Sequence, residues 1–360
     1  MAGLIRSIHI LGSRQFGGAD QFFVRLVRAL GDAGHPTLAV TRPGSPAAEA
    51  LAESGHEQVQ IPMANGFDLA SVWRIRSLVA DWQPDIVQTY MGRATRLTRL
   101  PGRRRAIHLA RLGGYYKIWG YYRHADGWIG NTRGVCDYLA GAGLPTDRIW
   151  HIANFVPEPS PCQPDELARI REGRYLPEDA WLMFALGRFI DIKGFDDLLQ
   201  AVALLPASVG GRRAHLMIAG DGPMKQTLHS LARELGLADR VTWLGWCADP
   251  TPYFRLADLM VCPSRHETLG NVILEAWRHR CPVVSTTTPG AREIATDGEN
   301  AWLCPVQAPP DLAASIRTAL EAPAQARERR AEQGFETVMS QYGREAILNA
   351  YVSLYERLRG

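Results

Sequence analysis

The chain has 360 residues, of which 46% are hydrophobic and 21% charged, a composition that excludes a disordered or fibrous protein. At about 150 residues per domain, this length predicts two domains. The net charge of +3 is unevenly distributed. Residues 1–155 contain 18 Lys and Arg and 11 Asp and Glu, a net charge of +7. The rest of the chain contains 22 Lys and Arg and 26 Asp and Glu, a net charge of −4. The basic first part predicts contact with an anionic partner.

Membrane-spanning and zinc-binding proteins are also excluded. No stretch approaches the roughly 18 to 20 consecutive apolar residues of a transmembrane helix, and residues 1–13 read as the start of a buried strand rather than as a signal peptide. The six cysteines are scattered, with no CxxC pair and no histidine at ligand spacing. We therefore expect a cytoplasmic protein with reduced thiols and no structural zinc.

The first half of the chain alternates predicted strands with helices. Residues 5–11 form a β-branched, apolar run that ends in a glycine-containing turn, and residues 21–34 place five apolar side chains on one helical face. A segment of helical length follows at 69–82. Further short strands are predicted at 37–40, 57–61, 85–89, 106–110, 127–130 and 148–152. This order predicts a parallel sheet covered by helices on both faces.

Four prolines between Pro157 and Pro164 break the alternation and mark the best linker candidate. A second alternation follows, with strands predicted at 181–187, 215–220, 241–245, 257–263 and 281–286, and helices at 195–205, 224–236 and 271–280. We expect an α/β protein of two Rossmann-like domains, residues 1–155 and 156–342.

The last segment, residues 343–360, is predicted to be an amphipathic helix. Its apolar face is expected to consist of Ile347, Ala350, Leu354 and Leu358. The helix is assigned as a segment that can pack back on the first domain.

Two cations follow the first predicted strand of the second half. Arg188 comes directly after the strand that ends at Gly187, and Lys193 opens the next helix. Cations at such a turn suit a diphosphate, because the helix N-terminus adds partial positive charge. The alternative is that both are ordinary solvated residues. Gly220, in the sequence IAGDGP, ends the next strand and is at least a turn residue.

Two carboxylates flank the start of another predicted helix. Glu267 follows a strand, and Glu275 lies in the second turn of the helix. Backbone N–H groups at Leu269, Gly270 and Asn271 can face a ligand there, and a carboxylate can accept hydrogen bonds from two adjacent sugar hydroxyls. The alternative is that Glu267 caps the helix and Glu275 is a surface residue. Against it, Glu275 lies in the apolar sequence VILEAW, where an unpaired carboxylate would be costly.

These motifs together resemble a known family. E-x7-E, GRF-x3-KG, GDGP, the turn GGAD after the first strand and EAW-x4-PVV are similar to the retaining family 4 glycosyltransferases of GT-B fold. Within that family, ARLGGYYK and GNTRGVCDYLAGAGLP resemble bacterial enzymes that build lipopolysaccharide core or other surface glycans. The resemblance covers nearly the whole chain and implies two Rossmann-like domains that face each other across a cleft.

The resemblance also assigns roles to the candidate residues. Arg188 and Lys193 would hold the diphosphate of a UDP- or GDP-type nucleotide sugar. Glu275 would hold the ribose and Glu267 the donor sugar. The amides of Leu269, Gly270 and Asn271 would bind the sugar or the distal phosphate. Gly220 would belong to the same nucleotide site. Gly17 and Gly18 would let the first loop close on the phosphate and the acceptor.

The implied reaction is a retaining transfer of a sugar, as by a hexosyltransferase, to a hydroxyl of a glycan or glycolipid. No metal or other cofactor is implied, because the Arg188 and Lys193 pair and the helix dipoles would neutralise the leaving diphosphate. The alternatives are a UDP-sugar 2-epimerase of the same fold and a non-catalytic protein that binds nucleotide sugars or membranes.

The sequence departs from the family at two loops of the first domain. Many members carry histidines there, near the donor sugar, whereas this chain reads VQTYMGRA and ARLGGYYK. Tyr90 and Arg111 are the predicted substitutes, and Arg111 joins the catalytic candidates.

A basic and aromatic stretch predicts a membrane-binding surface at Arg93–Arg105 and Tyr115–Tyr122. Arg93, Arg96 and Arg99 are spaced three apart, as on one helical face, and three further arginines follow at 103–105. Arginines suit lipid phosphates and amphipathic aromatics suit the headgroup level. The alternative is that the aromatics are core residues and the arginines a solvated face. We expect peripheral binding to the inner face of the plasma membrane and, without a recognition module, no nucleic acid.

Overall fold

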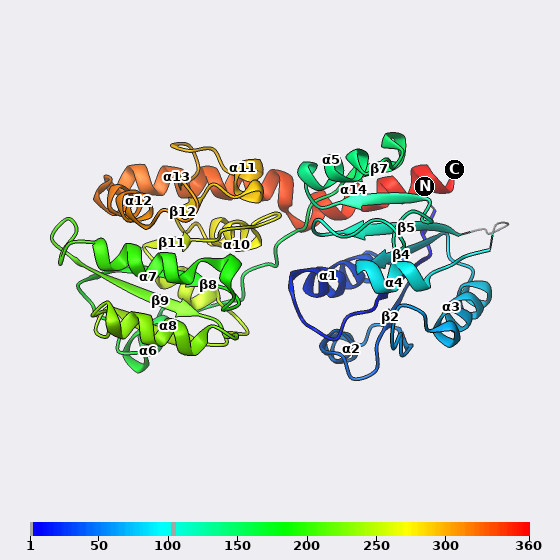
Figure 1. The fold of residues 1–360 in the computed structure, drawn as a ribbon, viewed down its shortest axis with the longest axis horizontal. Helices are drawn as coiled ribbons and strands as arrows, with labels where there is room; N and C mark the ends of the chain where they lie inside the picture. The colour runs from blue at the N-terminus through cyan, green and yellow to red at the C-terminus, as the bar shows by residue number, and fades with distance from the viewer. Residues whose placement is uncertain (1–2, 102–105) are drawn as a thin grey trace. The chain divides into compact units, whose positions relative to one another are not determined.

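The computed structural model describes residues 3–101 and 106–360 and consists of two α/β units (Figure 1). One unit comprises Met1–Phe155 with Gly343–Gly360, and the other comprises Val156–Tyr342. Each contains a parallel sheet with helices, so the predicted pair of Rossmann-like domains is confirmed. The described residues include no helix that is both long and apolar enough to cross a bilayer.

Within the described residues, the first unit has a seven-stranded parallel sheet of order β3-β2-β1-β4-β5-β6-β7. The strands are β1 (Ser7–Leu11), β2 (Thr37–Thr41), β3 (Gln58–Gln60), β4 (Ile86–Tyr90), β5 (Ile107–Leu112), β6 (Gly127–Gly130) and β7 (Ile149–His151). The helices are α1 (Gly18–Asp32), α2 (Pro46–Glu53), α3 (Leu69–Trp82), α4 (Met91–Leu97), α5 (Arg133–Gly141) and α14 (Arg344–Arg359), with a 3₁₀ turn η1 (Thr146–Arg148). Every strand predicted for this half is present.

The two faces of the first sheet differ in polarity. Ile8 and Ile10 of β1 pack into an apolar cluster with Ile75 of α3 and Ala94 of α4. His9, which points to the other face, is also fully buried and pairs in register with Gln88 of β4. A buried polar layer therefore lies on the second face, because side chains alternate along a strand.

Helix α14 covers this polar layer and belongs to the first unit. Its buried residues are Ile347, Tyr351, Leu354 and Tyr355. The predicted face was thus partly wrong, since Ala350 and Leu358 are only half-buried. Tyrosines occupy the buried stripe because their hydroxyls find partners on the sheet, as in the 2.8 Å hydrogen bond from Tyr355 Oη to Gln88 Oε1.

The second unit has, within the described chain, a six-stranded parallel sheet of order β10-β9-β8-β11-β12-β13. The strands are β8 (Ala180–Leu186), β9 (Arg213–Ala219), β10 (Val241–Gly245), β11 (Leu259–Cys262), β12 (Val283–Thr286) and β13 (Trp302–Cys304). The helices are α6 (Pro164–Gly173), α7 (Phe195–Leu204), α8 (Lys225–Glu234), α9 (Thr251–Leu256), α10 (Asn271–Arg278), α11 (Pro289–Ile294), α12 (Pro309–Glu321) and α13 (Ala324–Thr337), with the 3₁₀ turn η2 (Asp191–Lys193) and the π-helix η3 (Val338–Tyr342).

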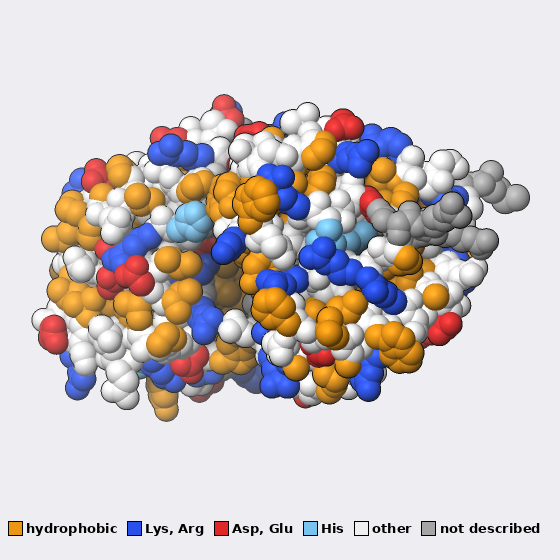
Figure 2. Space-filling model, turned by 45° about the vertical axis from the view of Figure 1, so that its right-hand side comes forward, with side chains coloured by type: hydrophobic (Ala, Val, Ile, Leu, Met, Phe, Trp, Pro, Cys, Tyr) orange, Lys and Arg blue, Asp and Glu red, His pale blue; other side chains and the backbone are white. Residues whose placement is uncertain are grey.

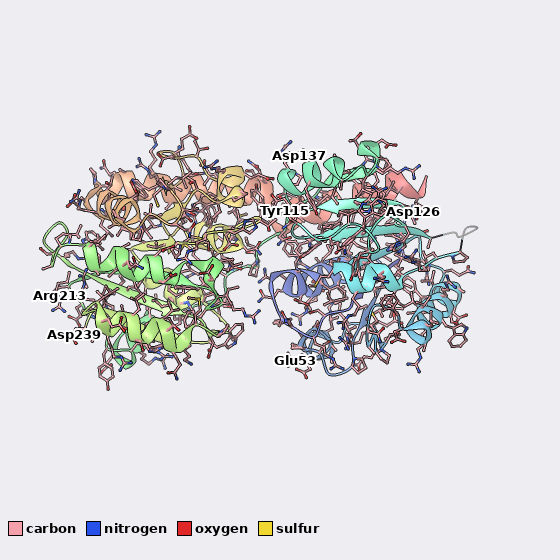
Figure 3. The ribbon with its side chains drawn as sticks, viewed as in Figure 1. Glu53, Tyr115, Asp126, Asp137, Arg213 and Asp239 are labelled. Atoms are coloured by element: carbon pink, nitrogen blue, oxygen red, sulfur yellow. The ribbon has the colours of Figure 1, made fainter. Side chains whose placement is uncertain are left out.

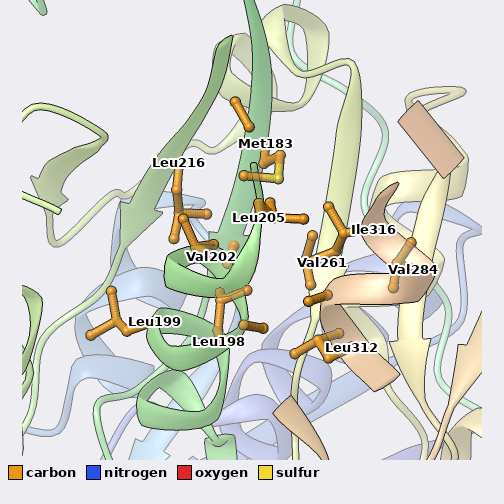
Figure 4. Packing of buried hydrophobic residues seen from close by; sticks show 14 of the residues in the cluster. Met183, Leu198, Leu199, Val202, Leu205, Leu216, Val261, Val284, Leu312 and Ile316 are labelled. Carbon is orange, nitrogen blue, oxygen red and sulfur yellow. The ribbon is translucent and has the colours of Figure 1, made fainter. Parts of the chain in front are cut away.

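The core of the second unit follows the alternation of its strands. Met183 of β8 and Val261 of β11 pack against Leu198 of α7 and Ile316 of α12 (Figure 4). Phe184, on the opposite face of β8, lies edge-on to Phe254 of α9. Both faces of the sheet are therefore buried, which explains the uninterrupted apolar sequence of β8.

The strands of this parallel sheet all begin at one edge and end at the opposite edge. Arg213 opens β9 and Asp239 precedes β10, and Figure 3 shows both at the same side of the unit. They mark the amino-terminal edge of the sheet. The loops that follow β8, β9 and β11 lie at the opposite, carboxyl edge, where ligands of parallel α/β sheets bind.

Candidate functional site

At the carboxyl edge of the second sheet, one predicted cation meets one predicted carboxylate. Lys193 at the end of η2 forms an ion pair with Glu267, which follows β11. Their side chains are only 22% and 13% exposed, and Ser264 Oγ donates a 2.8 Å hydrogen bond to Glu267 Oε1. Burial alone would lower the pKa of Lys193, but the charge and hydrogen bond of Glu267 outweigh it and raise that pKa. Lys193 is therefore a fixed cation at neutral pH.

Arg188, the second predicted cation, differs from Lys193 in being exposed. Its guanidinium has no hydrogen-bond or ion-pair partner within the described residues. The backbone beneath it is fixed, since Phe189 N donates to Asp221 O at 2.8 Å and Met224 N donates to Phe189 O at 3.0 Å. Arg188 is thus a positioned cation whose five donors can take an anionic ligand.

An arginine that the sequence analysis did not single out joins the two loops. Arg265 binds Asp191 of η2, Asp196 and Asp197 of α7 together. Its Nε lies 2.8 Å from Asp197 Oδ2 and its Nη2 lies 2.6 Å from Asp196 Oδ2. The backbone N–H of Arg265 also donates to Ile192 O at 2.9 Å. Arg265 therefore holds the segment that carries Lys193 against the segment that carries Glu267.

Two glycines let the same loops approach closely. Gly194 has φ +62°, and a Cβ at that position would lie 2.2 Å from Pro263 O. A Cβ on Gly220, the predicted nucleotide-site glycine, would lie 2.0 Å from Gly187 O. A side chain at Gly220 would push away the segment that positions Arg188, so packing by itself explains the requirement for glycine there.

Helix α10 begins beside Glu267. Its N-cap is Gly270, in the left-handed region at φ +82°, and no side chain caps the helix. Leu269 is buried, Asn271 opens the helix, and Glu275 lies half-buried on its second turn. Gly290, which the sequence analysis did not single out, donates from its N–H to Glu267 O at 2.9 Å. The predicted amides and carboxylates thus lie along one loop and helix.

The predicted first-domain residues Gly17 and Gly18 lie at the N-terminus of α1. Gly17 N donates to Asp20 Oδ2 at 2.9 Å, and the Asp20 side chain is buried. Burial raises the pKa of Asp20. This carboxyl, which the sequence analysis passed over, fixes the glycine turn.

Arg111 and Tyr90, the predicted substitutes for the family histidines, are enclosed in the first unit. Arg111 is 2% exposed, stacks on Phe22 at 4.1 Å, and donates to Tyr351 Oη at 3.2 Å and to Asn154. Tyr90 is equally buried, with its hydroxyl bonded to His9 and Gln88. Arg111 thus links β5 to α14, whereas the hydroxyl of Tyr90 is bonded within the sheet. Their contact with the donor sugar stays a prediction.

The predicted basic and aromatic surface is only partly assembled. Helix α4 carries Arg93 and Arg96 but ends at Leu97, so Arg99 does not share its face as predicted. Residues 103–105 lie outside the described residues. Of the predicted aromatics, Tyr115 and Trp119 are 40% and 67% exposed, whereas Tyr122 is a core residue at 1%.

Comparison with known proteins decides the family. Residues 16–158 match the family model described as Glycosyltransferase Family 4, and residues 168–337 match the model of Glycosyl transferases group 1. LpsE of Rhizobium meliloti, a lipopolysaccharide core biosynthesis glycosyltransferase, is 33% identical over 344 residues, covering 94% of this chain and 95% of LpsE. The chain therefore belongs to the glycosyltransferases that these two models describe, family 4 and group 1. The relatives favour sugar transfer over the epimerase alternative.

Solved glycosyltransferases share the fold of this glycosyltransferase. An enzyme from Rickettsia africae matches with a TM-score of 0.86 at 17% identity, over 98% of both chains. HepE of Anabaena, solved with UDP and glucose, matches with a TM-score of 0.83 at 18% identity, over 98% of this chain and 100% of HepE. At these identities the comparison shows the fold, which is GT-B.

Proposed function

We propose that this glycosyltransferase moves a hexose from a nucleoside diphosphate sugar to a hydroxyl of a glycan or glycolipid, with retention of configuration and without a metal ion. The observation that carries the proposal is the ion pair of Lys193 with Glu267 just before α10, with the exposed Arg188 in the loop after β8 at the same edge of the sheet. LpsE and the UDP- and glucose-bound HepE support the choice of lipopolysaccharide or surface-glycan synthesis and of a nucleotide sugar.

The departure of the diphosphate is the step that these cations assist. As the bond between sugar and phosphate breaks, negative charge accumulates on the diphosphate, and positioned positive groups stabilise it without reorganisation. Arg188 offers an exposed guanidinium, Lys193 a charged amine, and the uncapped N-terminus of α10 a partial positive charge. Together they supply the neutralisation for which other enzymes use a divalent cation.

Glu267 and Glu275 suit the hydroxyl groups of the same donor. A carboxylate only accepts hydrogen bonds, so each can orient two neighbouring hydroxyls. The ion pair of Glu267 with Lys193 supports a role for Glu267 beside the sugar and the distal phosphate. Glu275 lies further along α10 and suits the ribose.

The test begins with donor binding. Thermal unfolding and calorimetry with UDP, GDP and their hexose conjugates identify the nucleotide, since a ligand of the folded state raises stability. Arg188→Ala should weaken binding of that nucleotide about 10- to 100-fold, because a charge-assisted hydrogen bond contributes about 1.5–3 kcal/mol. Arg213→Ala is the matched control, an exposed arginine on the opposite edge of the same sheet. Equal loss in both variants would contradict the diphosphate role.

Transfer is then measured with lipopolysaccharide core oligosaccharides as the acceptor probe. We expect the anomeric proton of the product, observed by NMR, to show the configuration of the donor sugar, and turnover to persist in EDTA. An inverted product would refute retention, and complete inhibition by EDTA would refute metal independence.

We further propose that the enzyme works as a peripheral protein on the cytoplasmic face of an anionic membrane, where a glycolipid acceptor would be reached. The excess of basic residues in the first 155 positions supports this association.

A further inference from the structure

Three arginines follow neighbouring strands at the carboxyl edge of the first sheet. Arg14 lies three residues after β1, Arg42 comes directly after β2, and Arg93 lies in the first turn of α4, which follows β4. Because β2, β1 and β4 are adjacent parallel strands, the loops at their ends lie side by side. These three residues are called the arginine cluster, and none of them belongs to the site of the second unit.

One turn of the backbone holds two members of the arginine cluster. Arg42 Nε donates to Pro62 O at 2.8 Å, and Arg93 Nη1 donates to the next carbonyl oxygen, Met63 O, at 3.3 Å. The turn is fixed, because the Met63 side chain is fully buried and its N–H donates to Ser71 Oγ at 3.0 Å. Met63 also has φ +42°, a conformation that is unfavourable for residues other than glycine and that often marks a functional segment. The two guanidinium groups are therefore anchored at adjacent carbonyl oxygens.

The loop after β1 brings the third arginine close to the other two. Gly12 packs on Arg93, since a Cβ at Gly12 would lie 3.3 Å from Arg93 Cβ, and Arg14 follows two residues later. Burial and, after it, the charges of Arg93 and Arg14 lower the pKa of Arg42, as neighbouring like charges do. The three positive charges therefore repel one another in the free protein.

No carboxylate balances this charge among the residues that the structure describes. None of the three arginines belongs to an ion pair there, and the segments that form this corner of the sheet contain no Asp or Glu. They are residues 12–17, 42–45, 61–67 and 91–94. The acidic residues that border them are bonded within their own turns. Asp20 accepts from Gly17 N at 2.9 Å, and Asp68 accepts from Ala64 N and Ser71 N, both at 3.0 Å.

The guanidinium groups of the arginine cluster keep free donors. Arg14 is exposed and Arg93 is half-buried. Arg42 is only 5% exposed, yet its two terminal nitrogens have no protein partner in the described part of the chain and remain open to solvent. Figure 2 shows basic side chains gathered on the visible face of the first unit, with few acidic side chains among them. Because a guanidinium binds two oxygens of one phosphate through parallel hydrogen bonds, this arrangement suits a multiply charged anion.

We propose that the arginine cluster binds a phosphate group carried by the acceptor glycan. The inference rests on the proposed sugar transfer and adds the class of acceptor, a phosphorylated sugar. A phosphomonoester carries a charge of about −1.5 to −2 at pH 7, so it balances more of the three arginines than the single charge of a carboxylate. The phosphate would be held by the loops after β1, β2 and β4, and no bond to it would be formed or broken.

The test compares two acceptor probes, phosphate-bearing core oligosaccharides of lipopolysaccharide used intact or after treatment with alkaline phosphatase. Calorimetry on the full chain without donor measures their binding. Wild type should bind the intact probe about 10- to 100-fold more tightly, the range for charge-assisted hydrogen bonds. Arg14→Gln should lose most of this preference without a fall in the melting temperature of the free protein, because it removes a like charge from two neighbours. Arg74→Gln is the matched control, an exposed arginine on α3 of the same unit, and should behave like wild type.

Four outcomes would overturn the proposal. Equal binding of both probes by wild type would remove phosphate as the recognised group, and a preference kept by both Arg14→Gln and Arg93→Gln would place the phosphate elsewhere. Inorganic phosphate that competes as strongly as the intact probe would reduce the cluster to a general anion site. Weaker nucleotide binding by Arg14→Gln would assign the cluster to the donor. Transfer is measured separately, and its absence alongside selective binding of the intact probe would contradict the proposed function while the phosphate site stands.

Discussion

Arg265 shows how a residue with no ligand role can decide the geometry of a site. It binds three aspartates on the segment that carries Lys193, and it lies two residues before Glu267. Its side chain is 16% exposed. Hydrogen bonding to Asp197 and, secondarily, to Asp196 raises the pKa of Arg265 against the opposing effect of burial. The planar guanidinium presents five donors in a fixed fork, whereas a lysine amine presents three donors on a flexible stem.

We predict that Arg265→Lys keeps the fold but lowers kcat at least tenfold with a smaller change in KM. The lysine preserves the charge and loses the fork, so Lys193 and Glu267 would remain present but misaligned for the transition state. Steady-state kinetics and melting temperature measure the two effects. Arg280→Lys is the control, because Arg280 pairs with Glu332 on the surface, where such a pair contributes little. Wild-type kcat in Arg265→Lys would remove Arg265 as a positioning residue.

Among individual residues, those that belong to sequence motifs were predicted as site residues. Those whose role depends on contacts with distant parts of the chain were missed. The family resemblance assigned Lys193 and Glu267 to the same nucleotide sugar, and the structure pairs them. Arg265 was missed because its aspartate partners lie 68 to 74 residues away in the sequence. The buried surroundings of Arg111 could not be predicted for the same reason, since its partner Tyr351 is 240 residues away.

Elements differ in how much of their environment the sequence reveals. Strand β8 is buried on both faces and was predicted from its continuous apolar run. Strand β13 has only three residues, and α6 buries none of its side chains, so neither gave a periodic signal. The buried face of α14 differs from the predicted one because Tyr351 and Tyr355 are buried with their hydroxyls hydrogen-bonded to Arg111 and Gln88. A pattern of aliphatic residues does not reveal such buried tyrosines.

Gly194, in the turn between η2 and α7, allows a prediction about stability. Gly194→Ala should lower the free energy of unfolding by clearly more than the roughly 1–2 kcal/mol of a left-handed alanine, because the new methyl group would overlap Pro263 O. Gly210→Ala is the matched control, with φ +56° and no atom within 4 Å of its Cβ. Urea unfolding of both variants separates backbone strain from the clash. Equal destabilisation would mean that the close approach to Pro263 is relieved at no cost.

For the whole molecule, the buried His9 predicts how the free energy of unfolding depends on pH. His9 lies in the polar layer that joins the first sheet to α14, with Nδ1 at 2.9 Å from Tyr90 Oη and Nε2 at 3.1 Å from Ser7 Oγ. Burial lowers its pKa to about 3. The imidazole is therefore neutral in the folded chain at every pH at which the enzyme would work.

The unfolded chain takes up a proton on His9 near pH 6.5, which the folded chain does not do until about pH 3. Between these values the unfolded state binds more protons, so stability must fall as the pH falls, by about 1.4 kcal/mol per pH unit from this residue. His9→Gln cannot titrate. The difference in the free energy of unfolding between wild type and this variant should therefore shrink by about 1.6 kcal/mol between pH 6.5 and 5.0. Urea unfolding at both pH values measures this change, and His124, His215 and His279, whose pKa burial also lowers, contribute equally to both proteins. A difference that stays constant with pH would show that His9 is protonated in the folded chain and that the polar layer beneath α14 carries a charge.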